Sequence, residues 1–291
     1  MSVTCRAKIN LCLHVVGKRP DGFHQLQSLV TFAQFGDELS IVDQTHTGGG
    51  DELQIDGEFA SLLANDKTNL VIGALDAFRK RWPKALTDNL ALRLTKNLPI
   101  ASGIGGGSAN AASLLKLASE ISSKKIDPEQ LQNLAANIGS DVPVCLLERP
   151  AIMAGRGEDI KPLKNFPTLF AVLVNPGITV STREIFANLD QVKNGPLPDI
   201  SEKFSMEELV NWLHRSRNDL DQAAKKKVPE IARIIAEFQA NPNCLFARMS
   251  GSGATVFALF NHMEKAEQGA EIINKKWPEY WVKPTILMGS G

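Results

Sequence analysis

The 291-residue sequence has no apolar run close to the roughly 20 residues that a membrane-spanning helix requires. It also has no excess of either charge, since 32 basic side chains balance 32 acidic ones. Nothing in this balance draws the chain to nucleic acid or to an anionic membrane. The amino-terminal stretch lacks the apolar segment of a secretory signal. We therefore expect a globular cytoplasmic protein without a nucleic-acid or membrane partner.

Cysteine is scarce, with four residues in the chain, Cys5, Cys12, Cys145 and Cys244. None of them forms a C-x-x-C pair or has a histidine nearby at metal-ligand spacing. This pattern predicts reduced, buried thiols and no protein-built metal site. The chain is 43% apolar, which is ample for a large core.

Alternating residues at the start of the chain predict strands. From Val3 to Val15 every second residue is apolar, which is typical of a half-buried strand with Lys8 and Asn10 on one face. The run 17–22 is a turn, and 26–35 and 38–42 are further strands. Helical spacing after Thr68 predicts a helix over 70–78, and alternation predicts a strand over 90–94 that leads into Pro99.

The most unusual segment is PIASGIGGGSANAA, from Pro99 to Ala112. Apolar spacing from Ala109 to Ile121 predicts that a helix follows its glycines directly. Glycines let the backbone approach an anion closely, and the first N–H groups of the helix attract negative charge. The segment lacks the Lys-Ser/Thr of a Walker A loop, and Ser108 replaces the last glycine of G-x-G-x-x-G. It is either a phosphate-binding loop or a tight strand-to-helix crossing.

Local signals place the remaining elements. Asp127, Pro128 and Gly139 mark the ends of a helix, and Asp141 follows it. Later segments predict strands at 151–154 and 169–174, helices opened by Ser181-x-x-Glu184 and Ser205-x-x-Glu208, a surface connection over 192–202 and a helix after Pro229. The final segments, 245–249, 254–260, 263–276 and 281–287, read strand, strand, helix, strand, as in a split βαβ sandwich.

The string P-x-x-x-G-x-G-G-G-S-A resembles the signature of the galactokinase, homoserine kinase, mevalonate kinase and phosphomevalonate kinase superfamily. The later Ser250-Gly-Ser-Gly-Ala-Thr-Val-Phe resembles its third motif. The resemblance implies a two-domain α/β (α+β) small-molecule kinase fold: an amino-terminal domain like domain 2 of ribosomal protein S5, at 1–157, and a ferredoxin-like domain at 158–291. It implies ATP with Mg²⁺ as the phosphoryl donor. It assigns ATP binding to Asn69, Pro99, Gly103, Gly105, Gly106, Gly107, Ser108, Ala109 and Asn110, and a supporting turn to Gly251, Ser252 and Gly253.

One branch of this superfamily is especially similar. Ala7-Lys-Ile-Asn-Leu, Gly17-Lys-Arg-Pro-Asp-Gly-Phe-His, Gly139-Ser-Asp-Val-Pro and Thr182-Arg-Glu-Ile-Phe resemble the kinases that phosphorylate a cytidine diphosphate-linked methylerythritol in isoprenoid precursor synthesis. Phosphoryl transfer needs a group that accepts the proton of the substrate hydroxyl and a positive charge nearby. The resemblance gives these two roles to Asp141 and Lys8. Without it, Asp141 is a turn residue and Lys8 a solvated strand lysine.

The resemblance also implies the substrate contacts. Phe23 and Phe186 are the candidates to sandwich the cytosine ring, and His24 is the candidate to read its edge, whereas Asn10 and Thr182 contact phosphates or polyol. The sequence departs from the branch at Phe23, where a tyrosine is usual, and at Val30, where an aromatic residue is usual. Both departures concern substrate affinity rather than reaction class.

Two alternatives stay open at this point. A kinase for homoserine or mevalonate would have the same loop, but its substrate carries no base for Phe23 and His24 to contact. An inactive nucleotide-binding regulator would need neither Lys8 nor Asp141. A monomer or a weak homodimer is expected.

Overall fold

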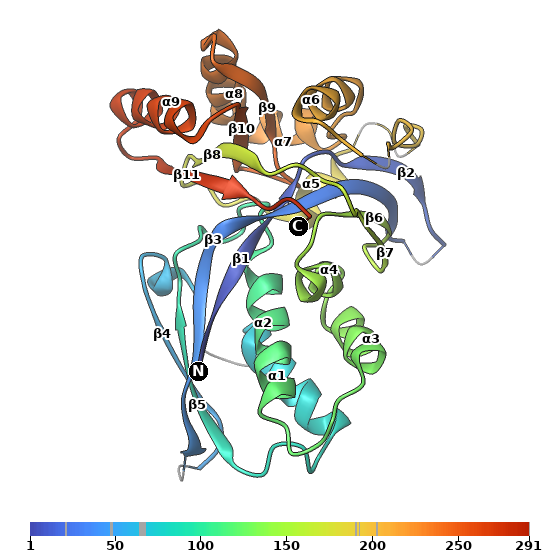
Figure 1. Ribbon diagram of the computed structural model, residues 1–291, viewed down its shortest axis with the longest axis vertical. Helices are drawn as coiled ribbons and strands as arrows, with labels where there is room; N and C mark the ends of the chain where they lie inside the picture. The colour runs from blue at the N-terminus through green and yellow to red at the C-terminus, as the bar shows by residue number, and fades with distance from the viewer. Residues whose placement is uncertain are drawn as a thin grey trace. The chain divides into compact units, whose positions relative to one another are not determined.

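A computed structural model describes residues 1–20, 22–46, 49–63, 68–189, 191, 193–201 and 203–290 (Figure 1). Parts of two predicted segments lie outside these ranges, namely Asp21 of the turn 17–22 and Val192 and Glu202 of the connection 192–202. The chain forms two compact units. The first comprises Met1–Ala7, Phe35–Ile100 and Gly105–Glu148, and the second comprises Lys8–Gln34, Ala101–Ile104 and Arg149–Gly291. Both units contain residues from the first 157 of the chain. The predicted domain boundary after residue 157 stays a prediction.

Two strands contribute to both units. Strand β1 covers Ser2–Asn10 and pairs with β3, which covers His24–His46. The sequence predicted two strands in place of β3, because Gly36-Asp37 resembles a turn. Gly36 instead lets the strands come close, since a Cβ at this position would lie 2.1 Å from the carbonyl oxygen of Cys5. The chain therefore continues through Gly36 as one strand.

The first unit combines strands with a group of helices. Strand β5 lies between β3, to which it is antiparallel, and β4, to which it is parallel. Besides parts of β1 and β3, the first unit contains β4 (Glu52–Asp56), η1 (Ala60–Leu62), α1 (Leu70–Arg81), β5 (Asn89–Thr95), α2 (Gly106–Glu120), α3 (Pro128–Ile138) and α4 (Val142–Leu147). Helix α2 is almost entirely buried in its middle, because Ala111, Ala112, Leu114 and Leu115 present small and branched side chains on several faces.

The second unit contains the antiparallel sheet β11-β8-β10-β9, against which helices α8 and α9 pack (Figure 1). Strands β2, β3, β6 and β7 form a further antiparallel group, which joins this sheet where Leu287 of β11 pairs with Ala33 of β3. The elements of this unit are β2 (His14–Lys18), β6 (Ala151–Gly155), β7 (Asp159–Pro162), β8 (Leu169–Asn175), α5 (Thr182–Ala187), α6 (Met206–Arg215), α7 (Asp221–Lys227), α8 (Glu230–Ala240), β9 (Cys244–Met249), β10 (Val256–Phe260), α9 (Met263–Lys276) and β11 (Trp281–Leu287).

The predicted strand over 3–15 was partly wrong. Strand β1 ends at Asn10 and β2 begins at His14, so the alternation spans two strands. From Ala7 to Val15 the residues of both faces are buried, including Lys8 (4% exposed) and Asn10 (3%). Lys8 is therefore not a solvated strand lysine. Three of the four cysteines are buried, as predicted, and Cys244 is partly exposed.

Among the helices that the structure describes, none has the length and apolarity needed to span a bilayer.

Candidate functional site

The second unit brings the two glycine segments together. The Ser250 hydroxyl donates a hydrogen bond to the carbonyl oxygen of Gly103 (3.0 Å) and accepts one from the backbone N–H of Asn10 (3.0 Å). Gly103 has a positive φ of 76°, and a Cβ on it would lie 2.4 Å from the Ser250 carbonyl oxygen and 2.7 Å from the Gly253 nitrogen. Only glycine fits this contact. The turn Ser250–Gly253 therefore supports the entrance of the glycine loop directly.

Lys8 and Asn10 lie at the end of β1, beside the start of the glycine loop in this unit. The backbone N–H of Lys8 donates to the carbonyl oxygen of Ile104 (2.9 Å), which belongs to the glycine loop. The side-chain amide of Asn10 donates to Ser28 Oγ (2.7 Å), and Ser28 in turn donates to the carbonyl oxygen of Cys12 (2.6 Å). These contacts hold the end of β1 against the loop.

Helix α5 connects the glycine turn with the predicted base-binding residues. Thr182 Oγ1 and Ser252 Oγ are 2.9 Å apart and share a hydrogen bond. Phe186, four residues further along the helix, stacks on the ring of His24 with a centroid distance of 5.0 Å and an interplanar angle of 23°. Residues four apart share one face of a helix, so α5 presents both side chains in the same direction. Burial and the nearby Lys18 charge lower the pKa of His24, which favours the neutral ring at pH 7.

The sandwich of a cytosine ring between Phe23 and Phe186 stays a prediction, and the structure gives the surroundings of Phe23. Its ring is 51% exposed and has the guanidinium of Arg156 5.1 Å from its centroid. Phe186 instead has the ring of His24 beside it. A base-binding surface in this region would therefore be formed by His24, Phe186 and the Arg156-Phe23 pair together.

The first unit contains the part of the loop that is predicted to bind phosphate. Gly105 occupies the N-cap position of α2 in a left-handed conformation and offers no side-chain cap, and the first turn of the helix contains no acidic residue. The first helical bond joins the Ala109 N–H to the Gly105 carbonyl (2.8 Å). The N–H groups of Gly106, Gly107 and Ser108 thus precede the helical hydrogen bonds, and the positive end of the helix dipole lies there. This is a suitable place for an anion.

A buried amide next to this turn supports the same interpretation. Asn110 is 2% exposed, and its Oδ1 has no hydrogen-bond partner among the described residues. An unpaired buried oxygen is costly unless a ligand or water satisfies it. A metal-bound nucleotide would supply such a partner, so the residues fit ATP with a divalent cation.

Lys96 and Asp37 are site residues that the sequence did not indicate. They form a buried ion pair, and a Cβ on Gly106 would lie 3.5 Å from Lys96 Nζ and 3.7 Å from Asp37 Oδ2. Asp37 Oδ1 also accepts the N–H groups of Asn97 (2.8 Å) and Leu98 (2.9 Å). The pair therefore fixes the chain just before Pro99 and puts a lysine beside the first turn of α2. No local sequence pattern predicts this contact, because the two residues are 59 positions apart.

Asn69 and Asp141 also lie in the first unit. Asn69 caps α1 by accepting the Val71 N–H (2.9 Å), and the side chain of Leu70 approaches the position of a Cβ on Gly107 to 3.3 Å. The N-terminus of α1 therefore adjoins the first turn of α2. Asp141, predicted in a loop, occupies the N-cap position of the short helix α4 without a side-chain cap bond. Lys8 belongs to the other unit.

Comparisons with known proteins are consistent with this arrangement. The model of the GHMP kinase N-terminal domain matches residues 69–149, and that of the GHMP kinase C-terminal domain matches residues 201–279. A 4-diphosphocytidyl-2-C-methyl-D-erythritol kinase from Chelativorans sp. (strain BNC1) is 42% identical over 284 residues, covering 98% of this chain and 95% of the relative. The chain belongs to the GHMP kinase family. The predicted family and fold class are thereby confirmed.

Further similarities extend over the whole of this GHMP kinase. The kinase of the same description from Roseobacter denitrificans is 41% identical over 290 residues, covering 99% of this chain and 93% of the relative. The crystal structure of a 4-(cytidine 5'-diphospho)-2C-methyl-D-erythritol kinase is 28% identical with a TM-score of 0.77, over 99% of this chain and 100% of that one. A homoserine kinase from Cytophaga hutchinsonii, 16% identical with a TM-score of 0.69 over 100% of this chain and 96% of that one, shares the fold.

Proposed function

We propose that this GHMP kinase transfers the γ-phosphoryl group of ATP to the 2-hydroxyl of 4-diphosphocytidyl-2-C-methyl-D-erythritol, a step in isoprenoid precursor synthesis. The observation that carries the proposal is the name shared by relatives about 40% identical over nearly the whole chain. The stacked pair of His24 and Phe186 supports a substrate with a base, which homoserine and mevalonate lack.

In the proposed mechanism the hydroxyl oxygen attacks the γ-phosphorus, its proton passes to Asp141, and the bond to the β-phosphate oxygen breaks to release ADP. Lys8 is the electrostatic partner of Asp141 in this proposal and orients the hydroxyl. The N–H groups of Gly106, Gly107 and Ser108 bind the phosphates, and Asn69 and Pro99 lie at the nucleotide.

Mg²⁺ would neutralise charge on the transferring phosphoryl group. Ser108 Oγ and Asn110 Oδ1 are the oxygen donors of the first turn of α2 that would help to hold it, since Mg²⁺ prefers oxygen ligands.

In this proposal Asn10, Phe23, His24, Thr182 and Phe186 bind the cytidyl substrate, and Gly251, Ser252 and Gly253 support the glycine loop. The backbone N–H of Lys8 donates a hydrogen bond to Ile104, so the backbone from which the Lys8 side chain extends is fixed beside the loop. We further propose that the enzyme works as a monomer or weak homodimer in the cytoplasm, where ATP is available and its free thiols stay reduced.

The test is ATP turnover with 4-diphosphocytidyl-2-C-methyl-D-erythritol, homoserine and mevalonate, using wild type, Asp141→Asn and the exposed control Asp159→Asn. We expect turnover with the cytidyl substrate alone, loss of at least about 1,000-fold in Asp141→Asn and little change in Asp159→Asn. Near-normal turnover in a folded Asp141→Asn protein would refute the proposed base. Turnover with another alcohol would assign a different substrate.

A further inference from the structure

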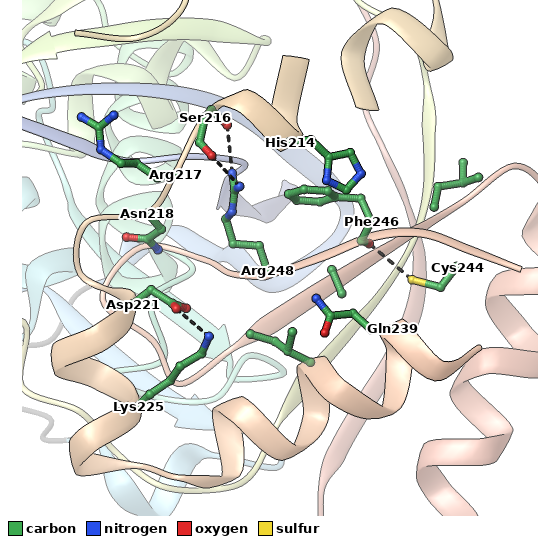
Figure 2. A pocket seen from close by; sticks show the side chains of 13 residues that line it. His214, Ser216, Arg217, Asn218, Asp221, Lys225, Gln239, Cys244, Phe246 and Arg248 are labelled. Carbon is green, nitrogen blue, oxygen red and sulfur yellow. Dashed lines mark hydrogen bonds and ion pairs between the residues drawn. The ribbon is translucent and has the colours of Figure 1, made fainter. Parts of the chain in front are cut away.

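A second cavity, of about 510 Å³, lies in the second unit beside β9, the last strand of its sheet (Figure 2). Its walls are β9, α7, α8 and the segment that follows α6. None of the residues assigned above to ATP or to the cytidyl substrate lines it. Its volume is in the range of small-molecule sites in proteins.

Arg248 is the central charge of this cavity. Its Nη1 donates to the carbonyl oxygen of Leu11 (3.1 Å) and to Ser216 Oγ (2.9 Å), and its Nη2 donates to the carbonyl oxygens of Leu213 (2.9 Å) and Ser216 (2.8 Å). All four acceptors are neutral, and within the described part of the chain no carboxylate pairs with this guanidinium. Burial lowers the pKa of Arg248, and the nearby charge of Asp221 opposes the effect. The cavity wall therefore contains a positive charge that has no direct carboxylate partner among the described residues; its four Nη–H groups are already in use, so it acts on a ligand mainly through its charge.

Two further side chains offer hydrogen-bond donors. Lys225 Nζ pairs with Asp221 Oδ2 at 2.6 Å, which leaves two of its three N–H groups for another partner. The amide of Gln239 extends from α8 toward the space between Arg248 and the Asp221-Lys225 pair (Figure 2). The second oxygen of Asp221 is buried without a partner in the described structure, and because it only accepts, it favours a donor group of a ligand rather than its anionic head. Polar groups with unmet bonds in a cavity are typical of a site for a ligand.

Part of the cavity wall is apolar and aromatic and adjoins the polar groups. The Arg248 guanidinium lies 4.6 Å from the centroid of the Phe246 ring, and His214 meets that ring edge-on at 5.1 Å. Ile235 and Leu245 complete this wall. A ligand that fills the cavity must therefore present a flat or apolar body here.

A metal ion does not fit these walls, because Asp221 is the single acidic residue among the described lining residues. We propose that the cavity is a binding site for a small organic anion, with a phosphate or carboxylate head near Arg248, Lys225 and Gln239 and a flat apolar body against Phe246.

The test uses isothermal titration of the full chain with phenyl phosphate and with benzoate, which differ only in the head group, and with phenol, which has no charge at neutral pH. The variant Gln239→Glu puts a negative charge into the cavity. The same substitution at exposed Gln222 of α7, which does not line the cavity, is the matched control.

We expect at least one of the two anions to bind, with an affinity at least fivefold lower in Gln239→Glu and unchanged in Gln222→Glu. The tighter anion identifies the head group, and phenol should bind at least tenfold more weakly than that anion. Equal affinity in Gln239→Glu and wild type would show that the anions bind elsewhere, for example at the ATP loop, and would overturn the proposal. Absence of binding by both anions, or binding of phenol as tight as theirs, would overturn it as well.

Discussion

The Ser250 hydroxyl donates a 3.0 Å hydrogen bond to the carbonyl oxygen of Gly103, which lies 147 positions earlier in the chain. The same hydroxyl accepts the N–H of Asn10, so one side chain joins the end of β1, the glycine loop and the glycine turn. The amide of Asn218 holds the turn from another side, by donating to the carbonyl oxygens of Met249 (3.0 Å) and Gly251 (2.8 Å).

Ser250→Ala should weaken catalysis without unfolding the protein. It leaves the Asn10 N–H and one lone pair of the Gly103 carbonyl without a partner, which costs about 1–3 kcal/mol. We expect kcat/KM for ATP to fall about tenfold in steady-state kinetics. The control Ser201→Ala, at an exposed hydroxyl that bonds only within its own loop, should keep wild-type kinetics. Wild-type kcat/KM in Ser250→Ala would contradict this role.

Gly103→Ala should abolish activity. Its Cβ would lie 2.4 Å from the backbone oxygen of Ser250, and its φ of 76° is unfavourable for alanine. We expect turnover to fall at least about 100-fold, because displacement of reacting groups by about 1 Å costs that much. Gly73→Ala in α1 is the matched control, since nothing lies within 4 Å of its Cβ. The control should be active and about 0.4–1 kcal/mol more stable, and equal activity of the two variants would refute the predicted strain.

Local signals predicted several elements well. Helix α3 begins after Asp127, whose side chain accepts the Gln130 N–H (3.0 Å), and ends before Gly139, as expected from the sequence. The box at Ser205 and Glu208 forms both of its hydrogen bonds. Ser181 accepts the Glu184 N–H (3.4 Å) but forms only this half of the predicted box. These features depend on residues close in sequence, which is why the sequence reveals them.

Contacts between distant residues were not predictable. Alternation at Lys8 and Asn10 predicted one exposed face, but packing from other segments buries both residues. The contact of Gly103 with Ser250 and the pair Asp37-Lys96 join residues that no spacing rule connects. The family resemblance supplied most of the candidate site residues, whereas Lys96 and Asp37 emerged from the three-dimensional contacts.

Lys96→Met should destabilise the first unit strongly. The pair with Asp37 is buried, with side-chain exposures of 3% and 0%, so removal of the lysine leaves an uncompensated buried carboxylate. Breaking such a pair costs about 3–5 kcal/mol. Lys116→Met, which removes a pair to Glu148 with exposures of 29% and 22%, should cost less than about 1 kcal/mol. Urea unfolding of both variants measures the difference, and similar midpoints would refute the predicted contribution.

Phe186→Leu should raise KM for the cytidyl substrate and leave KM for ATP unchanged. Loss of base stacking costs about 1–3 kcal/mol, which corresponds to roughly 5- to 150-fold in KM. Phe170→Leu is the control, because Phe170 packs against the same apolar cluster without an assigned substrate contact. Phe186→Tyr should restore a low KM. An equal rise of KM in both leucine variants would indicate a packing role alone.

Stability of the second unit should depend on pH through His14. Its Nδ1 lies 3.0 Å from the carbonyl oxygen of Pro196, which can only accept, so Nδ1 carries the proton and Nε2 accepts the Arg217 N–H at 3.0 Å. Burial, reinforced by the charge of Arg217, lowers the pKa of His14 below 6.5. Between the folded pKa and 6.5 the unfolded chain binds more protons, so stability rises with pH in this window and levels off above it.

Replacement of His14 by Gln should remove this part of the pH dependence, at the cost of lower stability near pH 7. Urea unfolding between pH 5 and 8 of wild type, His14→Gln and the exposed control His262→Gln measures the slopes. The control should retain the wild-type rise in stability between the folded pKa of His14 and pH 6.5. An unchanged slope in His14→Gln would exclude His14 as its source. A reduced slope would show that the neutral ring, through its bonds to Pro196 and Arg217, contributes to holding these two segments together.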